Sequence, residues 1–153
     1  MLTEDSPAPH PSFTIGDGSA SVADFLGKPL VLYFYPKDDT TGCTKEAQEF
    51  SALAADFATA GAVVIGISKD SAKSHAKFIA KYALEVQLGA DESGDVCEAF
   101  GVWVEKSMYG KKYMGIERST FLIRADGTIA RVWRKVKVPN HAAEVLQAVT
   151  LLG

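Results

Sequence analysis

Cysteine is scarce in this sequence: among its 153 residues only Cys43 and Cys97 carry a thiol. Two cysteines do not make the disulfide framework of a small secreted domain, and a chain of this length can bury a core without one. Each thiol is therefore either a small apolar side chain in the core or a reactive centre. The first interpretation is the more common one for a buried cysteine, so the neighbouring residues must decide.

Long apolar runs and a large excess of one charge are also missing. No run approaches the roughly 20 apolar residues that span a bilayer, and the net charge is −3. This balance gives no reason to expect nucleic acid or a membrane as a partner. Residues 1–11 lack the basic start and apolar centre of a signal peptide. We expect them to be a flexible lead-in on a cytoplasmic protein, followed by a single domain over residues 12–153.

Metal-ligand spacings are absent as well. His10, His75 and His141 lie far apart, and none has such a spacing with either cysteine. The helical pattern around His75 places this residue on the polar face of a helix. We therefore expect no metal and no other cofactor.

Strand and helix patterns alternate along the rest of the chain. Residues 30–35 form a continuous apolar run between turn residues and predict a buried strand. The pattern then predicts a helix from residue 43 to Gly61, a strand at 62–67, a helix capped by Asp70 or Ser71, a short helix at 93–100, a hairpin of strands 119–123 and 128–136, and a helix after Asn140. A short strand is expected at 12–15, and residues 102–114 fit no clear pattern. A strand–helix–strand unit followed by a hairpin and a helix predicts an α/β, thioredoxin-like fold, with a central mixed β-sheet flanked by helices on both faces.

Cys43 occupies a favourable place in this predicted fold. It lies between the carboxyl end of a buried strand and the first turn of a helix, where ligands tend to bind in α/β sheets. Unpaired N–H groups and the positive end of the helix dipole favour a thiolate there. A helix terminus contributes only about 0.3–2 kcal/mol, so an efficient enzyme also needs donors that stabilise charge in the transition state.

Two separated motifs resemble one family. Pro36, Thr40 and Cys43 have the spacing of the peroxiredoxin signature: proline, three residues, threonine or serine, two residues, cysteine. The similarity extends over residues 33–37 and 42–44, and far downstream over residues 117–122. The sequence resembles the bacterioferritin comigratory protein, or peroxiredoxin Q, subfamily from Ser12 to Leu152.

The resemblance implies a thiol peroxidase that reduces hydrogen peroxide and organic hydroperoxides. Cys43 would be the peroxidatic nucleophile, and the hydroxyl of Thr40 would hydrogen-bond the thiolate and a peroxide oxygen. Pro36 would shield the sulfur from water, and Arg118 would be a fixed cation and double donor. Many relatives carry proline where this chain has Thr41, which should make the loop less rigid.

The resembling subfamily places its resolving cysteine at one of two positions, which are Gln48 and Ile79 here. Both usual sites are therefore empty. We expect a one-cysteine cycle in which an external thiol, thioredoxin or glutathione with glutaredoxin, reduces the sulfenic acid. Cys97 remains either a structural residue, an unusual resolving cysteine, or a thiol that pairs between molecules.

Other interpretations stay open to different degrees. A disulfide oxidoreductase needs Cys-x-x-Cys, and Thr40 takes the first position here. A peroxide sensor that relays oxidation to a partner, or a thiol-dependent holdase, would use the same site. Subfamily relatives are often monomers, so we expect a monomer.

Aromatic and methionine residues suggest a route for bulky substrates. Tyr35, Trp103, Met108 and Tyr109 are candidates for an apolar entrance for organic hydroperoxides. Ordinary core packing is the alternative for the same residues.

Overall fold

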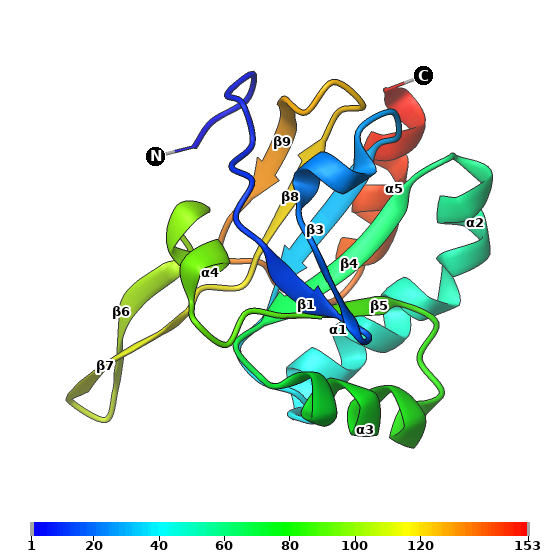
Figure 1. Cartoon of the computed structure of the whole chain (residues 1–153). Helices are drawn as coiled ribbons and strands as arrows, with labels where there is room; N and C mark the ends of the chain where they lie inside the picture. Colours follow the sequence, from blue (N-terminus) through cyan, green and yellow to red (C-terminus); the bar gives the residue numbers. More distant parts are fainter. Residues whose placement is uncertain (1, 153) are drawn as a thin grey trace.

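The structure, a computed structural model, describes residues 2–152 (Figure 1). Its centre is a seven-stranded sheet in the order β2-β1-β5-β4-β3-β8-β9. The strands of this sheet are β1 (Phe13–Ile15), β2 (Gly18–Ala20), β3 (Leu30–Phe34), β4 (Val63–Ser68), β5 (Gln87–Ala90), β8 (Ser119–Ile123) and β9 (Ile129–Trp133). A separate hairpin consists of β6 (Trp103–Met108) and β7 (Lys111–Ile116). The helices are η1 (Val22–Phe25), α1 (Thr41–Ala52), α2 (Ala54–Thr59), α3 (Ala72–Tyr82), α4 (Asp95–Ala99) and α5 (His141–Leu151).

The central strand β3 divides the core into two layers. It pairs parallel with β4 and antiparallel with β8, and all its residues are buried. Val31 and Tyr33 face the layer covered by α1, α2, α3 and α5, whereas Leu32 and Phe34 face the layer covered by α4, η1 and the N-terminal segment. The sheet is therefore mixed and has helices on both faces, which confirms the predicted α/β, thioredoxin-like fold.

The long helix expected up to Gly61 is interrupted at Leu53. The N–H of Leu53 donates to the carbonyl of Phe50, three residues back, at 3.1 Å. This tighter turn ends α1 and starts α2. Phe50 and Phe57, on either side of the break, still lie in the same apolar layer.

Strand β5 was not predicted because it is short and contains Gly89. A Cβ at Gly89 would lie 2.7 Å from side-chain atoms of both Ile67 and Phe13. The glycine therefore allows β5 to fit between β4 and β1, against which it pairs. Because glycine has no side chain, Gly89 interrupts the alternation of apolar and polar residues by which a strand is predicted.

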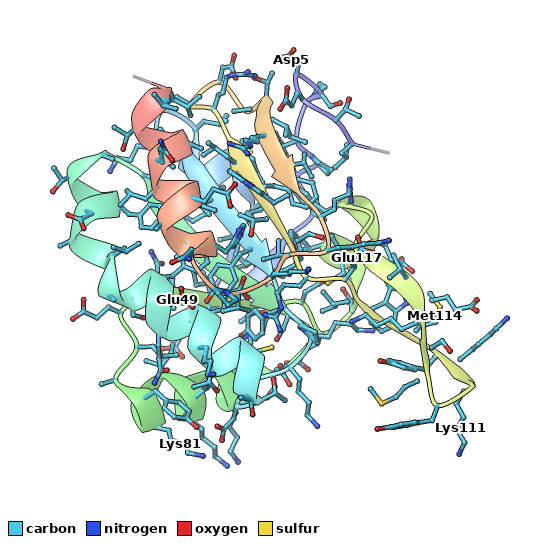
Figure 2. All side chains as sticks on the ribbon, turned by 180° about the vertical axis from the view of Figure 1, so that it is seen from behind. Asp5, Glu49, Lys81, Lys111, Met114 and Glu117 are labelled. Atoms are coloured by element: carbon cyan, nitrogen blue, oxygen red, sulfur yellow. The ribbon has the colours of Figure 1, made fainter. Side chains whose placement is uncertain are left out.

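The segment without a clear pattern, residues 102–114, is mostly the β6–β7 hairpin. The strands pair antiparallel from Trp103↔Ile116 to Met108↔Lys111, and the turn between them has positive φ at Tyr109 and Gly110. The hairpin projects from the main sheet (Figures 1 and 2). Its outer side chains are exposed, so they carry no alternation between core and solvent.

The segment before β1 runs along the β8–β9 hairpin. The N–H groups of Asp5 and Ala8 donate to the carbonyls of Ile129 at 2.7 Å and Gly127 at 2.9 Å. Ala8 is buried, and Asp5 also pairs with Arg124 at 3.0 Å. A domain boundary at residue 12 stays a prediction, and these contacts favour placing residues 5–8 with the folded domain. Within residues 2–152, no helix has the length and apolar character required to cross a bilayer.

Candidate active site

The backbone brings Cys43 and Arg118 to the same edge of the sheet. Residues 35–40 leave the carboxyl end of β3 as a loop, and α1 begins at Thr41, so Cys43 lies in its first turn. Arg118 directly precedes β8, whose first residue, Ser119, pairs with Phe34 at the end of β3. The antiparallel register therefore places Arg118 beside the start of α1.

The guanidinium of Arg118 links two side chains of α1. Its Nη2 donates to Sγ of Cys43 at 3.2 Å, and its Nη1 donates to Oε1 of Glu46 at 2.6 Å. Cys43 is 2% exposed and Glu46 is 1% exposed. Burial works to lower the pKa of Arg118, but the negative charges of Glu46 and Cys43 more than offset this effect, so that the pKa is raised. Arg118 is thus a permanent cation at the sulfur.

Glu46 is a site residue that the sequence reasoning missed. Burial raises the pKa of its carboxyl to about 7, although Arg118 acts in the opposite direction. Its second oxygen, Oε2, is buried and has no hydrogen-bond partner among residues 2–152. The available signal was its position three residues after Cys43, which puts both on one face of a helix.

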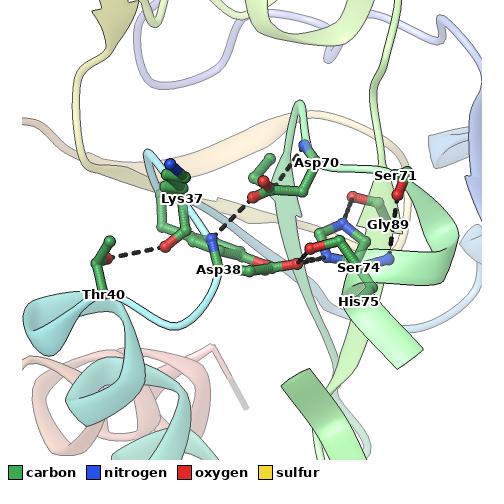
Figure 3. A network of polar contacts seen from close by, with 10 residues as sticks. Lys37, Asp38, Thr40, Asp70, Ser71, Ser74, His75 and Gly89 are labelled. Carbon is green, nitrogen blue, oxygen red and sulfur yellow. Dashed lines mark hydrogen bonds and ion pairs between the residues drawn. The ribbon is translucent and has the colours of Figure 1, made fainter. Parts of the chain in front are cut away.

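Thr40 and Pro36 both lie in the loop before α1, and the hydroxyl of Thr40 has a different partner from the one that the resemblance implied. The hydroxyl of Thr40 donates to the carbonyl of Lys37 at 2.8 Å, and Thr40 makes no hydrogen bond to Cys43 (Figure 3). Thr40 is the N-cap residue of α1, and its carbonyl accepts from the N–H of Thr44 at 2.8 Å. Pro36 is exposed at the start of the loop. The catalytic roles expected for these two residues stay predictions.

A buried polar network holds this loop against α3 (Figure 3). The carboxylate of Asp38 accepts from the hydroxyls of Tyr35 at 2.6 Å and Ser74 at 2.8 Å, and it contacts Nδ1 of His75 at 2.7 Å. Burial works to raise the pKa of Asp38, but the hydrogen bonds from His75 and Tyr35 more than offset it and lower that pKa.

The prediction that His75 lies on a polar helix face is wrong. His75 is 3% exposed, and its second ring nitrogen, Nε2, contacts the carbonyl of Gly89 at 3.0 Å. Because both ring nitrogens have partners, the imidazole can be buried without a large penalty. Helical periodicity records polarity and therefore cannot distinguish a buried polar partner from a solvated one.

Two further contacts fix the loop. The carboxylate of Asp70 accepts from the N–H of Asp38 at 2.8 Å and from the hydroxyl of Ser68 at 2.7 Å. Asp39, with a positive φ of 58°, is held by Lys81 at 2.7 Å and by the hydroxyl of Tyr82. The loop is therefore tied to the end of β4 and to both ends of α3.

Asp38, Asp70 and His75 have ligand-type atoms within 4.8 Å of one another. Hydrogen bonds within the loop network already use these groups. We assign the cluster to loop positioning.

The structure does not bring Cys97 near Cys43. Cys97 lies in α4, is fully buried, and belongs to the layer on the opposite face of the sheet from Cys43. Burial, followed by the nearby carboxylate of Asp91, raises the pKa of its thiol well above the usual range. A neutral, enclosed thiol is a poor nucleophile.

The four candidates for an apolar entrance do not form one surface. Tyr35 is buried in the loop network, whereas Tyr109 is fully exposed at the hairpin turn. Trp103 is half-buried under Nζ of Lys69, 4.0 Å from the ring centre, and Met108 is exposed. The expectation of a shared entrance is therefore wrong for Tyr35.

A thioredoxin-like sheet that presents a cysteine at a helix start, against a fixed arginine, defines a class of thiol-based redox enzymes. Comparison with known proteins narrows this class. The model of the AhpC/TSA family matches residues 6–132. Peroxiredoxin Bcp of Bacillus subtilis is 50% identical over 129 residues, which cover 84% of this chain and 82% of that protein. Peroxiredoxin Bcp of Xanthomonas campestris is 51% identical over 133 residues, which cover 87% of this chain and 83% of that protein.

Solved structures agree with these relatives. A variant of Xylella fastidiosa PrxQ superimposes with a TM-score of 0.94 at 39% identity, covering 99% of this chain and 98% of that one. The bacterioferritin comigratory protein of Xanthomonas campestris, studied for alkyl peroxide reduction, gives a TM-score of 0.88 at 42% identity, with 95% and 97% covered. The chain belongs to the AhpC/TSA family and, within it, to the peroxiredoxins of the Bcp or peroxiredoxin Q type. It is a thiol peroxidase, which confirms the function that the resemblance implied.

Proposed function

We propose that Cys43 is the peroxidatic nucleophile of a one-cysteine cycle. The observation that supports this proposal is the 3.2 Å hydrogen bond from Nη2 of Arg118 to Sγ of Cys43 in the first turn of α1. A guanidinium donor and the helix start both stabilise a thiolate over a thiol.

The first step is attack on a peroxide bond. The thiolate of Cys43 donates an electron pair to the terminal oxygen of the hydroperoxide, so that an S–O bond forms and the O–O bond breaks. Sulfur is oxidised by two electrons to the sulfenic acid, and the departing alkoxide or hydroxide takes up a proton to leave as alcohol or water.

Arg118 would stabilise this step most. In the transition state, negative charge moves from the sulfur toward the leaving oxygen. The guanidinium of Arg118, fixed at hydrogen-bond distance from the sulfur, stays close to this charge and stabilises the transition state. For Thr40 to bind a peroxide oxygen, its hydroxyl would turn from the carbonyl of Lys37. Pro36 would limit water access at the loop.

Regeneration would use external thiols. The first thiol forms a mixed disulfide with Cys43 and releases water, and the second releases Cys43 and leaves as a disulfide. The absence of cysteine at positions 48 and 79, and the placement of Cys97 across the sheet, support this cycle. Thioredoxin, or glutathione with glutaredoxin, is the expected reductant.

The location and assembly of the protein follow from the same proposal. Both thiols are free, and a cycle that ends with external thiols needs a reducing compartment such as the cytoplasm. Because Cys43, Arg118 and Glu46 all come from one chain, a monomer suffices for the chemistry. Light scattering would measure the oligomeric state.

Intact mass after one equivalent of hydrogen peroxide tests the proposal. Wild type and Cys97→Ser should both gain the mass of one oxygen atom and should then react with a reagent specific for sulfenic acids. Cys43→Ser should gain no oxygen. Turnover with each reductant should survive in Cys97→Ser.

Two results would contradict parts of this proposal. Oxidation that is unchanged in Cys43→Ser would remove Cys43 as the nucleophile. A Cys43–Cys97 disulfide would instead make Cys97 the resolving cysteine and would favour thioredoxin.

A further inference from the structure

The β6–β7 hairpin combines exposed apolar side chains with positive charge. Met108, Tyr109, Tyr113 and Met114 are all exposed. The hairpin also carries Lys106, Lys111 and Lys112 against a single acidic residue, Glu105, although the whole chain has a net charge of −3. Figure 2 shows Lys111 and Met114 on its projecting part.

Lys106 differs from the other lysines because its side chain lies along the hairpin. The strand register places Lys106 opposite Tyr113, and Val104 opposite Gly115, all on one face. Cδ of Lys106 is 3.2 Å, and Cε is 3.5 Å, from the place that a Cβ on Gly115 would occupy. The missing side chain at Gly115 therefore lets Lys106 extend toward the end of β7, which leads into Arg118.

The side chain of Lys106 brings a second cation to the strand end that leads to the site, because its Cε lies beside Gly115, three residues before Arg118. Burial, and next the positive charge of Arg118, lower its pKa, while Glu117 and Cys43 act in the opposite direction. Among residues 2–152, Lys106 forms no ion pair, whereas Lys112 pairs with Glu105 at 3.6 Å. Arg118, in contrast, already donates hydrogen bonds to Cys43 and Glu46.

We propose that Lys106 is a specificity-determining residue that binds the carboxylate of an anionic organic hydroperoxide while its peroxide group meets Cys43. The proposal rests on the proposed role of Cys43 and leaves the covalent step unchanged. Two neighbouring cations repel each other, and an anion between them relieves that repulsion. Val104, Tyr113 and Met108 on the same face offer apolar contact for the organic part.

A pair of substrates that differ only in charge tests this proposal. We would measure kcat/KM for N-acetyl-leucine hydroperoxide and for its methyl ester in wild type, Lys106→Met and Lys112→Met. Lys106→Met should reduce the value for the acid about tenfold, the effect of losing one charged contact, and that for the ester less than twofold. Lys112→Met should retain the wild-type ratio, because Lys112 is 78% exposed and paired with Glu105.

Gly115→Ala provides a second variant that keeps the charge. The added methyl group would displace the Lys106 chain, so the acid should again lose more activity than the ester. Equal losses for acid and ester in Lys106→Met, or no loss for either, would overturn the proposal. Ester reduction that persists in Cys43→Ser would instead overturn the proposed function.

Discussion

At the residue scale, the position of Arg118 depends on a carboxylate that is itself poorly solvated. Oε1 of Glu46 accepts from Nη1 at 2.6 Å, while its other oxygen has no hydrogen-bond partner in the described part of the chain. Because the pKa of Glu46 is about 7, its carboxyl is ionised above that pH, and replacing this charged acceptor by a neutral amide then weakens the hydrogen bond by about 1 kcal/mol or more. The guanidinium would then be less firmly aimed at Cys43.

We therefore expect Glu46→Gln to lower kcat/KM for hydrogen peroxide about tenfold, the equivalent of about 1.4 kcal/mol. Stopped-flow oxidation of the reduced protein would measure this rate. Glu49→Gln, a change on the same helix farther from Cys43, is the control and should keep the wild-type rate. Unchanged kinetics in Glu46→Gln would show that Arg118 does not need this partner.

His141 gives the stability of the protein a pH dependence of definite sign. Burial lowers the pKa of this imidazole to about 4, while its Nε2 contacts the hydroxyl of Thr120 at 2.8 Å. Below pH 6.5 the unfolded chain takes up a proton at His141, but the folded protein does so only near pH 4. Acid therefore favours the unfolded state within this window.

We expect the free energy of unfolding to fall between pH 7 and pH 4, with His141 contributing up to about 3 kcal/mol. His141→Gln keeps a polar partner for Thr120 but removes the titration, so its stability should fall less. Urea unfolding at several pH values would compare the two proteins. Parallel curves for wild type and variant would contradict this assignment.

At the scale of elements, the first turn of α1 and the residue before β8 approach closely. A Cβ on Gly42 would lie 3.3 Å from Nη2 of Arg118. Glycine in a helix is less favourable than alanine by about 1 kcal/mol. Gly42 therefore makes α1 less stable than alanine would, but it leaves space for the guanidinium of Arg118.

Gly42→Ala should therefore raise or maintain the melting temperature and lower kcat/KM by about tenfold, because small displacements of catalytic donors slow reactions strongly. Calorimetry and peroxidase assays on one preparation would measure both quantities. Gly18→Ala, where the nearest atom is 3.9 Å away, should leave activity unchanged. Full activity in Gly42→Ala would mean that Arg118 has room to adjust.

The elements that sequence patterns predicted are those whose burial is regular. β3 is apolar throughout, and α3 begins after Ser71, whose hydroxyl accepts from the N–H of Ser74 as a cap should. The pattern failed at β5, which depends on Gly89, and at β6–β7, which is exposed. The roles of His75 and Glu46 also escaped it, because each depends on a partner distant in sequence.

At the scale of the whole molecule, the N-terminal segment closes one side of the fold. Residues 5–8 pair with the β8–β9 hairpin, and Ala8 packs into the layer that contains Cys97. Contacts of this kind, two or three hydrogen bonds and one buried methyl group, contribute about 2 kcal/mol together. The site lies at another part of the sheet.

Removing residues 1–8 should lower the melting temperature by about 4–8 °C and leave the rate of Cys43 oxidation near that of the wild type. Removing residues 1–3 alone is the control and should have a smaller effect. Differential scanning calorimetry and peroxide oxidation would report the two properties. No thermal effect of the longer deletion would identify the segment as a dispensable lead-in.

The sheet also separates the two thiols, and this separation affects how long oxidation lasts. In the cycle we propose, no cysteine of the same chain reduces the sulfenic acid, so its lifetime depends on the concentration of thiols outside the protein. When those thiols run low, a second peroxide reaches Cys43 first and carries it to the sulfinic acid. The fraction of chains in that state would then record past episodes in which peroxide outran the supply of reductant.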